Sequence, residues 1–444
     1  MFGCSVVQLR GNINSIDKFR KATYSDNISC MMHDFNRKLC FYFFVKEGAL
    51  LLKITGIEAK VVKVSRELQS FSGTAGTPGT FVQMAGGAAS DYGWTKEYSS
   101  LYSKKVESLM VKITTDTGIV GWGEAQVPVG PEAPQALVRQ VLSPILLDQD
   151  PLGIEVLWFQ MYNSLRGRGH RGSFMMDAIG AVDTALWDIA GKHYGQPVYR
   201  LLGGAFREGI PLYHSGVSGT TASEKAASAQ EAVSKGYKAI KVYIGKGLRE
   251  DIAVMKAIRE AVGDDITLMA DALWMYNVHD ALRLGAALEK LDVALLEAPT
   301  VMEDVQGHAQ LTQALKLAVA QGETERTRYQ FLPYLKERAL DVIQPDIGRT
   351  GISEGKKIVT LAETFNIPAA LHMAIGQCVY VAASAHVATA TPNLLWLEMN
   401  PVMLEMANRF QRTPWTVADG MLKVPDLPGL GIEIDEEALQ RCVE

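Results

Sequence analysis

Eight short apolar segments recur in the second half of this 444-residue chain, and stretches with the periodicity of helices separate them. In chain order the segments read IPLYHSGV, KAIKVYIG, ITLMADA, VALLEAP, LAVAQGE, ALDVIQPD, IPAALHM and NLLWLEM. Alternation of apolar strands with helices is typical of a parallel sheet, because each parallel strand needs a crossover before the next. Eight such units predict a closed (β/α) barrel.

From the second segment onward, each predicted strand ends in one polar residue. The series is Lys241, Asp271, Glu297, Glu323, Asp346, His372 and Glu398, at intervals of 30, 26, 26, 23, 26 and 26 residues. Such regular intervals indicate equivalent positions around the barrel, at the carboxyl ends of its strands. In barrels of this kind that rim carries the active site.

The segment KAIKVYIG places a lysine inside a buried strand. Because side chains alternate along a strand, Lys241 and Tyr243 face away from the isoleucine and valine residues between them. A buried ammonium is costly unless it is paired or functional, so Lys241 requires a carboxylate partner. A lone carboxylate at a strand end is more often a helix cap or an ion-pair member than a ligand, but seven polar residues in register favour a functional site.

Five of the seven rim residues are carboxylates, which would repel one another unless a cation neutralised them. Asp271, Glu297 and Glu323 lie on consecutive strands and offer only oxygen ligands, with no cysteine or second histidine nearby to suit zinc. This set predicts Mg²⁺, which a few carboxylates commonly hold with positions left for substrate. Asp346 and His372 come from neighbouring strands, where the carboxylate can orient the imidazole as a general base or acid.

The first half of the chain has the pattern of a small α+β unit. LKITGIEAKVVKVSR alternates as a strand, and SLMVKITTDTGIVGWGEA predicts a hairpin with its turn at DTG. Residues 72–95 are rich in Gly, Ala, Ser and Thr and predict a mobile loop. Helical patterns follow, among them the long GSFMMDAIGAVDTALWDIAGKHYG. The preceding LRGRGHRG contains His170 and Arg171, which could reach an anionic substrate, with an ordinary surface loop as the alternative.

Composition argues against some classes of partner and favours one cellular compartment. The net charge of -5, with Lys and Arg scattered along the chain, argues against nucleic acid. No apolar run approaches the roughly 18 residues that a membrane span needs. Five cysteines, three of them within the first 40 residues, predict no disulfide framework and a reducing cytoplasm. Residues 1–50 predict an appended extension of unknown role, with a start codon assigned too far upstream as the alternative.

Over nearly all of residues 52–444, the chain resembles the enolase superfamily and, within it, the mandelate racemase subgroup. The resemblance rests on the ordered rim series, with LLEAP, QGE, IQPD, LHMAIG and LWLEM around it, and on TDTGIVGWGE and AVDTALWDIAGK in the first half. It implies an α+β capping domain at 51–180, completed by the tail 415–444, on a (β/α)7β barrel at 181–414. It also implies a small-molecule carboxylate substrate, and we expect a homo-oligomer.

The resemblance implies that the enzyme abstracts the proton α to a carboxylate while Mg²⁺ stabilises the enediolate. The implied metal ligands are Asp271, Glu297 and Glu323, and the implied catalytic residues are the Asp346–His372 dyad, Lys241, Tyr243 and Glu398. Three positions depart from the family pattern. Tyr243 replaces the second lysine of a Lys-x-Lys motif, Leu273 replaces an asparagine, and Ala298 replaces the second glutamate of Glu-Glu-Pro.

Tyr243 bears on the choice of reaction. Burial frees a lysine amine as a base but keeps a phenol protonated, so His372 is the one strong candidate base. Racemisation needs two bases, whereas dehydration of a sugar acid to a 2-keto-3-deoxy acid can use one residue as base, acid or both. We therefore expect a sugar-acid dehydratase. The alternatives are a cycloisomerase or lactonizing enzyme, a racemase or epimerase, and an inactive ligand-binding member of the family.

Overall fold

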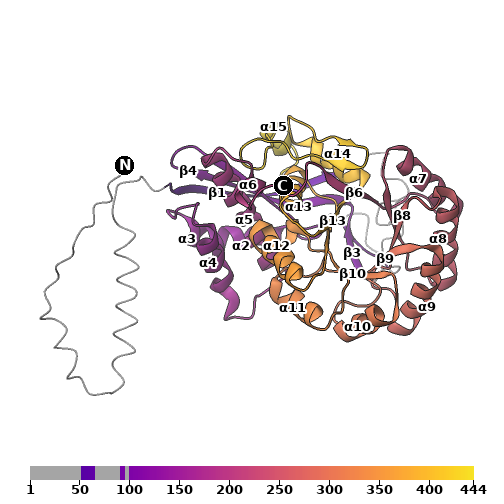
Figure 1. Ribbon diagram of the computed structural model, residues 1–444. Helices are drawn as coiled ribbons and strands as arrows, with labels where there is room; N and C mark the ends of the chain where they lie inside the picture. The colour runs from indigo at the N-terminus through magenta and orange to yellow at the C-terminus, as the bar shows by residue number, and fades with distance from the viewer. Residues whose placement is uncertain (1–51, 66–90, 96–99) are drawn as a thin grey trace, which may run out of the picture. The chain divides into compact units, whose positions relative to one another are not determined.

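The structure is a computed structural model that describes residues 52–65, 91–95 and 100–444, and residues 52–444 form one compact unit (Figure 1). The predicted extension 1–50 and most of the predicted loop 72–95 lie outside the described residues. At the end of that loop the expectation was wrong. Residues Tyr92–Thr95 form strand β2, which pairs with β3 (Ser100–Ser103), because their alternating side chains suit a short hairpin.

The barrel contains the eight predicted strands in chain order. They are β6 (Ile210–Ser215), β7 (Ala239–Tyr243), β8 (Thr267–Asp271), β9 (Val293–Glu297), β10 (Ala318–Gln321), β11 (Val342–Ile343), β12 (Ala369–Leu371) and β13 (Leu394–Met399). All neighbours are parallel, and β13 pairs with β6 to close the barrel. The predicted closed barrel is therefore confirmed.

Helices follow the strands and form the outer layer of the barrel (Figure 1). They are α7 (Ala222–Ser234), α8 (Leu248–Val262), α9 (Val278–Leu288) with the 3-10 turn η6 (Glu289–Leu291), α10 (Val305–Ala314), α11 (Arg328–Lys336), α12 (Ile347–Thr364) and α13 (Cys378–Thr389). The last strand is followed by the short α14 (Pro401–Arg409). None of the helices in the described ranges combines the length and apolar character that crossing a membrane requires.

The strands sort their side chains into two layers. The outward residues Ile240 and Val242 pack into the main core beneath the helices. The inward residues form a small apolar layer inside the barrel, made of Tyr213, Ala239, Met269, Leu295, Ala320, Val342 and Ala370. Two residues further along a strand the side chain points inward again, one layer closer to the rim. Ala239, Met269 and Leu295 are therefore followed by Lys241, Asp271 and Glu297.

The capping domain is built on a three-stranded antiparallel sheet in the order β1-β4-β5. Its strands are β1 (Ile54–Ser65), β4 (Lys105–Thr115) and β5 (Val120–Gln126), and its helices are α2 (Glu132–Leu137), the π-turn η5 (Val138–Leu142), α3 (Ser143–Leu146), α4 (Ile154–Arg166) and α5 (Phe174–His193). The predicted hairpin is thus β4–β5. Helix α5 lies so close to β5 that a Cβ on Gly123 would stand 1.7 Å from the carbonyl oxygen of Ala181.

Helix α5 also packs on the barrel helix α12. A Cβ on Gly180 would lie 2.8 Å from the backbone nitrogen of Gly351, so both positions require glycine. The remaining elements are α6 (Val198–Leu201), β14 (Val417–Ala418), β15 (Met421–Leu422) and α15 (Glu436–Gln440). The C-terminal tail reaches the cap, where the amide of Lys63 donates to the carbonyl of Cys442 at 2.9 Å. The predicted boundary between the cap and the barrel, at residue 180, falls inside helix α5. The division of the chain at that residue stays a prediction.

Candidate active site

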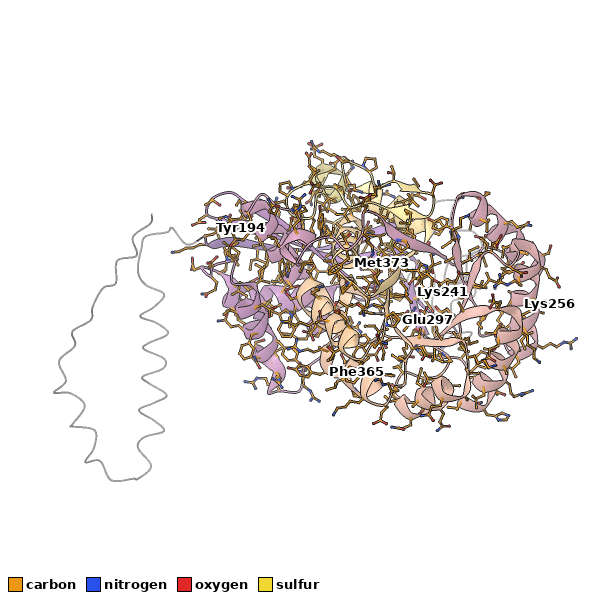
Figure 2. All side chains as sticks on the ribbon, viewed as in Figure 1. Tyr194, Lys241, Lys256, Glu297, Phe365 and Met373 are labelled. Carbon is orange, nitrogen blue, oxygen red and sulfur yellow. The ribbon has the colours of Figure 1, made fainter. Side chains whose placement is uncertain are left out.

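Lys241 is buried at the centre of a group of carboxylates in the barrel, where Figure 2 places it beside Glu297. Its Nζ lies 2.8 Å from Glu297 Oε2, 3.0 Å from Glu398 Oε1 and 3.4 Å from Asp271 Oδ2. Burial alone would lower the pKa of Lys241, but these carboxylates raise it well above its ordinary value. The predicted carboxylate partners of this buried lysine are therefore present, and it stays an ammonium.

His372 and Asp346 form the predicted pair. His372 Nδ1 lies 2.8 Å from Asp346 Oδ2, and its Nε2 lies 2.9 Å from Glu323 Oε2. Burial alone would lower the pKa of His372, but Glu323 and Glu398 raise it well above the ordinary value. The imidazole therefore carries two protons in this arrangement, one toward each carboxylate. Asp346 also caps α12, because its Oδ1 accepts from the amide of Gly348 at 2.8 Å.

Glu398 receives several donors in addition to Lys241. Its Oε2 accepts from Tyr213 Oη at 2.8 Å and from the amide of Met373 at 3.1 Å, and its Oε1 accepts from the hydroxyl of Ser215. Burial would raise the pKa of Glu398, but Lys241 and His372 lower it. This carboxylate is thus fixed as an anion between the two cationic side chains.

Several side chains that contact the rim residues were not predicted from the sequence. Among them are Tyr213 and Ser215 on the first barrel strand, Gln344, which donates to Glu297 Oε2, and Arg349, whose Nε lies 3.6 Å from Asp346 Oδ2. Tyr213 and Ser215 alternate in IPLYHSGV as Lys241 and Tyr243 do in KAIKVYIG, so the same pattern on the first segment would have found them. Gln344 stands two residues before Asp346 and follows the same rule.

Tyr243 lies near Lys241 and is bound by its hydroxyl to Ser215 Oγ at 2.9 Å. Burial raises its pKa well above the ordinary value of a phenol, although Lys241 opposes this effect. Tyr243 is therefore protonated at neutral pH. In the sheet order β7 is separated from β12, the strand that ends just before His372, by β6 and β13.

Two of the family departures lie where the backbone leaves the strands. Leu273 and Trp274 have φ of 50° and 58° after β8, and Ala298 has φ of 44° after β9. Non-glycine residues in this region are strained, and such strain gathers at functional sites. At Leu273 the conformation turns the amide to donate to Asp271 Oδ1 at 3.0 Å, which fixes that carboxylate.

The rim carboxylates are chemically suited to bind a divalent cation. Five carboxylates face three cationic side chains, Lys241, Arg349 and protonated His372, so two negative charges stay uncompensated when all five are ionised. Burial, followed by Asp271, raises the pKa of Glu297 to about 8, so the cluster as it stands favours binding a proton. A cation would relieve the same repulsion.

As the side chains stand, no group of three or more His, Cys, Asp or Glu residues in the described part of the chain is arranged to hold a metal ion. Lys241 lies against Asp271 and Glu297, and His372 binds Glu323. The two cationic side chains therefore occupy the oxygens that would serve as ligands. The assignment of these three carboxylates to Mg²⁺ stays a prediction.

His170 and Arg171 lie on an exposed turn between α4 and α5. Among the described residues, no hydrogen bond or ion pair links either side chain to the rim, so their role in substrate binding stays a prediction. Both cysteines in the described ranges, Cys378 and Cys442, are free.

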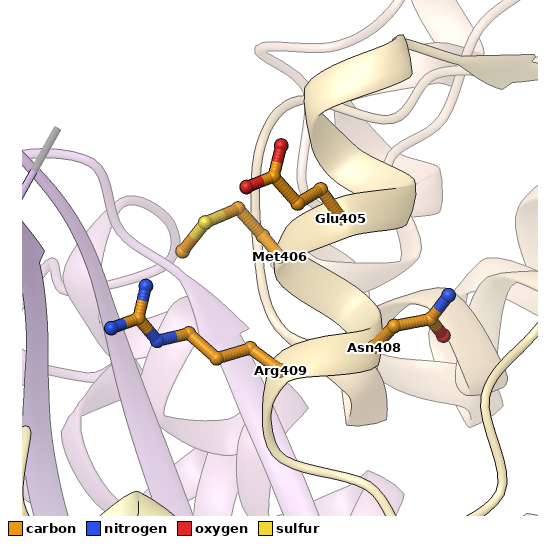
Figure 3. Close-up of a pocket in the computed structure, with 4 residues that line it drawn as sticks. All are labelled: Glu405, Met406, Asn408 and Arg409. Carbon is orange, nitrogen blue, oxygen red and sulfur yellow. The ribbon is translucent and has the colours of Figure 1, made fainter. Parts of the chain in front are cut away.

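A cavity of about 410 Å³ lies beside α14 (Figure 3). Its lining residues are Glu405, Met406, Asn408 and Arg409. None of these belongs to the rim cluster.

The chain is similar to known proteins over most of its length. Residues 99–203 match the N-terminal domain of the mandelate racemase / muconate lactonizing enzyme family, and residues 224–438 match the enolase C-terminal domain-like family. D-galactarolactone cycloisomerase from Agrobacterium fabrum is 37% identical over 360 residues, covering 77% of this chain and 93% of that protein. Arabinonate dehydratase from Saccharolobus solfataricus is 36% identical over 333 residues, covering 74% and 88%.

Among solved structures, a racemase from Streptomyces coelicolor with bound magnesium superimposes with a TM-score of 0.75 at 26% identity. That match covers 88% of this chain and 100% of the racemase.

Proposed function

Because the chain belongs to the mandelate racemase / muconate lactonizing enzyme family of the enolase superfamily, we propose that it dehydrates a sugar acid to a 2-keto-3-deoxy acid. The observation that carries this proposal is the asymmetry of the site. His372 is paired with Asp346, while Tyr243 stays protonated. Dehydration needs one residue that can take and return a proton, which matches this arrangement. The relatives that are sugar-acid dehydratases support it.

In this proposal the neutral form of His372 takes the α-proton at Nε2, once that nitrogen is free of Glu323, while Asp346 holds Nδ1–H and stabilises the imidazolium. The imidazolium then returns a proton to the β-hydroxyl as its C–O bond breaks. Water leaves, and the enol product becomes the 2-keto acid. Lys241 binds the carboxylate end of the substrate through its ammonium, and Glu398, whose Oε1 lies 3.0 Å from that ammonium, orients it.

A bound Mg²⁺ would be held by Asp271, Glu297 and Glu323 and would supply charge stabilisation for the enediolate. The uncompensated charge of the cluster supports this cofactor, as does the magnesium in the related racemase.

Cycloisomerisation of a sugar-acid lactone is the second candidate, because it too can proceed with one base. The 37% identity to D-galactarolactone cycloisomerase favours it. Racemisation is disfavoured, since Tyr243 cannot readily accept a proton. An inactive ligand-binding role is disfavoured by the complete dyad and by the well-bonded Glu398.

The test is a screen of purified protein with Mg²⁺ against monoacid and diacid sugars and their lactones. Release of a 2-keto acid from an open-chain acid supports dehydration, whereas ring opening of a lactone without loss of water supports cycloisomerisation. Treatment with EDTA should abolish turnover, and Mg²⁺ or Mn²⁺ should restore it. Full activity in metal-free protein would contradict the proposed cofactor.

A further inference from the structure

Tyr380, on α13, contacts Asp346 of the dyad. Its hydroxyl donates to Asp346 Oδ2 at 2.8 Å, the same oxygen that binds His372 Nδ1 at 2.8 Å. The hydroxyl also accepts from the amide of Ala374 at 3.0 Å. Burial and the neighbouring Asp346 keep the pKa of Tyr380 well above its ordinary value, so this phenol can only donate to the carboxylate.

Two glycines make room for the Tyr380 ring. A Cβ on Gly348 would lie 2.6 Å from the ring carbon Cδ2, and a Cβ on Gly376 would lie 2.3 Å from Cδ1. Gly348 lies in the segment that follows Asp346, and Gly376 lies in the segment that follows His372. The ring of Tyr380 therefore packs between the two backbone segments that carry the dyad. A ring held at both edges has little freedom to move its hydroxyl.

Glu124, on strand β5 of the cap, fixes the helix that carries Tyr380. Its Oε1 accepts from the amide of Gln377 at 2.6 Å, and its Oε2 accepts from the amide of Tyr380 at 2.9 Å. Both amides belong to the first turn of α13, where backbone N–H groups lack partners within the helix. Glu124 is fully buried and caps this turn from another domain.

We propose that Tyr380 and Glu124 are positioning residues for the dyad: Glu124 fixes the first turn of α13, and Tyr380 holds Asp346 Oδ2 at the point where His372 binds it. This inference rests on the proposed role of His372 as base and acid. In this way the capping domain influences proton transfer at His372 through hydrogen bonds that run from Glu124 to Tyr380 and on to Asp346.

The first test is Tyr380→Phe, which removes the hydroxyl and keeps the ring between its glycines. Loss of one hydrogen bond to a charged group should lower kcat about 10- to 100-fold, with KM changed less than about twofold. Tyr334→Phe is the matched control, because the buried Tyr334 hydroxyl also donates once, to Met302, and accepts once, from Gln321. The control should keep kcat. Equal kcat in wild type and Tyr380→Phe would overturn the proposal.

The second test asks whether Glu124 acts through Tyr380. Glu124→Gln should also lower kcat, and its effect should shrink markedly when Tyr380 is already phenylalanine. In the Tyr334→Phe background the effect of Glu124→Gln should remain whole. Independent effects in the Tyr380→Phe background would overturn the coupling.

A third readout does not depend on turnover. In protein labelled with ¹⁵N-histidine, the Nδ1 signal of His372, assigned by its loss in His372→Asn, should shift in Tyr380→Phe and stay in place in Tyr334→Phe. If the wild type turns over no acid, the proposed function fails while this comparison still decides the positioning role. An unchanged His372 signal in Tyr380→Phe would overturn it.

Discussion

Glu297 shows at the scale of one residue how burial and charge combine in this site. It is fully buried, accepts from Lys241 at 2.8 Å and from Gln344, and has a pKa raised to about 8 by burial and by Asp271. In the proposed role of Glu297 as a ligand of Mg²⁺, replacement of one carboxylate oxygen by an amide nitrogen would remove the negative charge that attracts the cation, while the shape of the side chain is kept.

Glu297→Gln should therefore lower Mg²⁺-dependent turnover at least about 100-fold and weaken Mg²⁺ binding, which calorimetry measures directly. Glu354→Gln is the control, because Glu354 is an equally buried carboxylate on α12 whose partner is Arg328. The control should bind Mg²⁺ as the wild type does. Unaltered Mg²⁺ binding by Glu297→Gln would remove this residue from the ligand set.

At the scale of elements, the contact between α5 and α12 links the cap to the barrel. Besides the paired glycines, Asp183 on α5 accepts from the amide of Ser353 at 2.8 Å and from its hydroxyl. Burial raises the pKa of Asp183 from 3.8 to about 7, although the Ser353 hydrogen bonds oppose this shift. Between these two values the folded state holds a proton that the unfolded chain releases.

The sign of the resulting pH dependence follows from linkage. The stability contributed by protonated Asp183 is full below about pH 4, falls as the pH rises toward 7, and is level above that, with a total of at most about 4 kcal/mol. The difference in Tm between wild type and Asp183→Asn should therefore fall from about pH 4.5 to 7 and then stay constant. A difference that is flat or rises over that window would contradict the assigned pKa shift.

At the scale of the whole molecule, the cap and the barrel are closed by segments from both ends of the described chain. Leu52 is buried in the cap core, the amide of Lys53 donates to Asp116 at 3.0 Å, and the C-terminal Glu444 donates its amide to Val61 at 3.1 Å. The compact unit that contains the cap and the barrel begins at Leu52.

Removal of residues 1–50 should leave the Tm and the turnover of the protein unchanged, since the described core and rim are built from Leu52 onward. Removal of residues 1–56 is the contrasting variant, because it also takes away Leu52 and Ile54, which are buried in the cap core. That variant should melt at a lower temperature. A large drop in Tm for the shorter deletion would show that the extension is part of the folded structure.

The barrel and most of the rim could be predicted from the sequence, because strand alternation and regular spacing are patterns along the chain itself and do not depend on tertiary contacts. Lys241, Asp271 and Glu297 follow from their period of two along single strands. Tyr380 could not be found in this way, since it lies on a helix and reaches Asp346 only through tertiary packing. The pairing of His372 with Glu323 was missed for a similar reason, because it depends on how two side chains from separate strands meet.

His372 is the proposed base that removes the α-proton, and exchange of that proton with D₂O, followed by NMR, tests this role most directly. With an acid that the wild type turns over, the rate of exchange or elimination should fall at least about 100-fold in His372→Asn. In Tyr243→Phe the rate should fall less. Exchange that persists in His372→Asn and vanishes in Tyr243→Phe would contradict this role and assign the base to Tyr243.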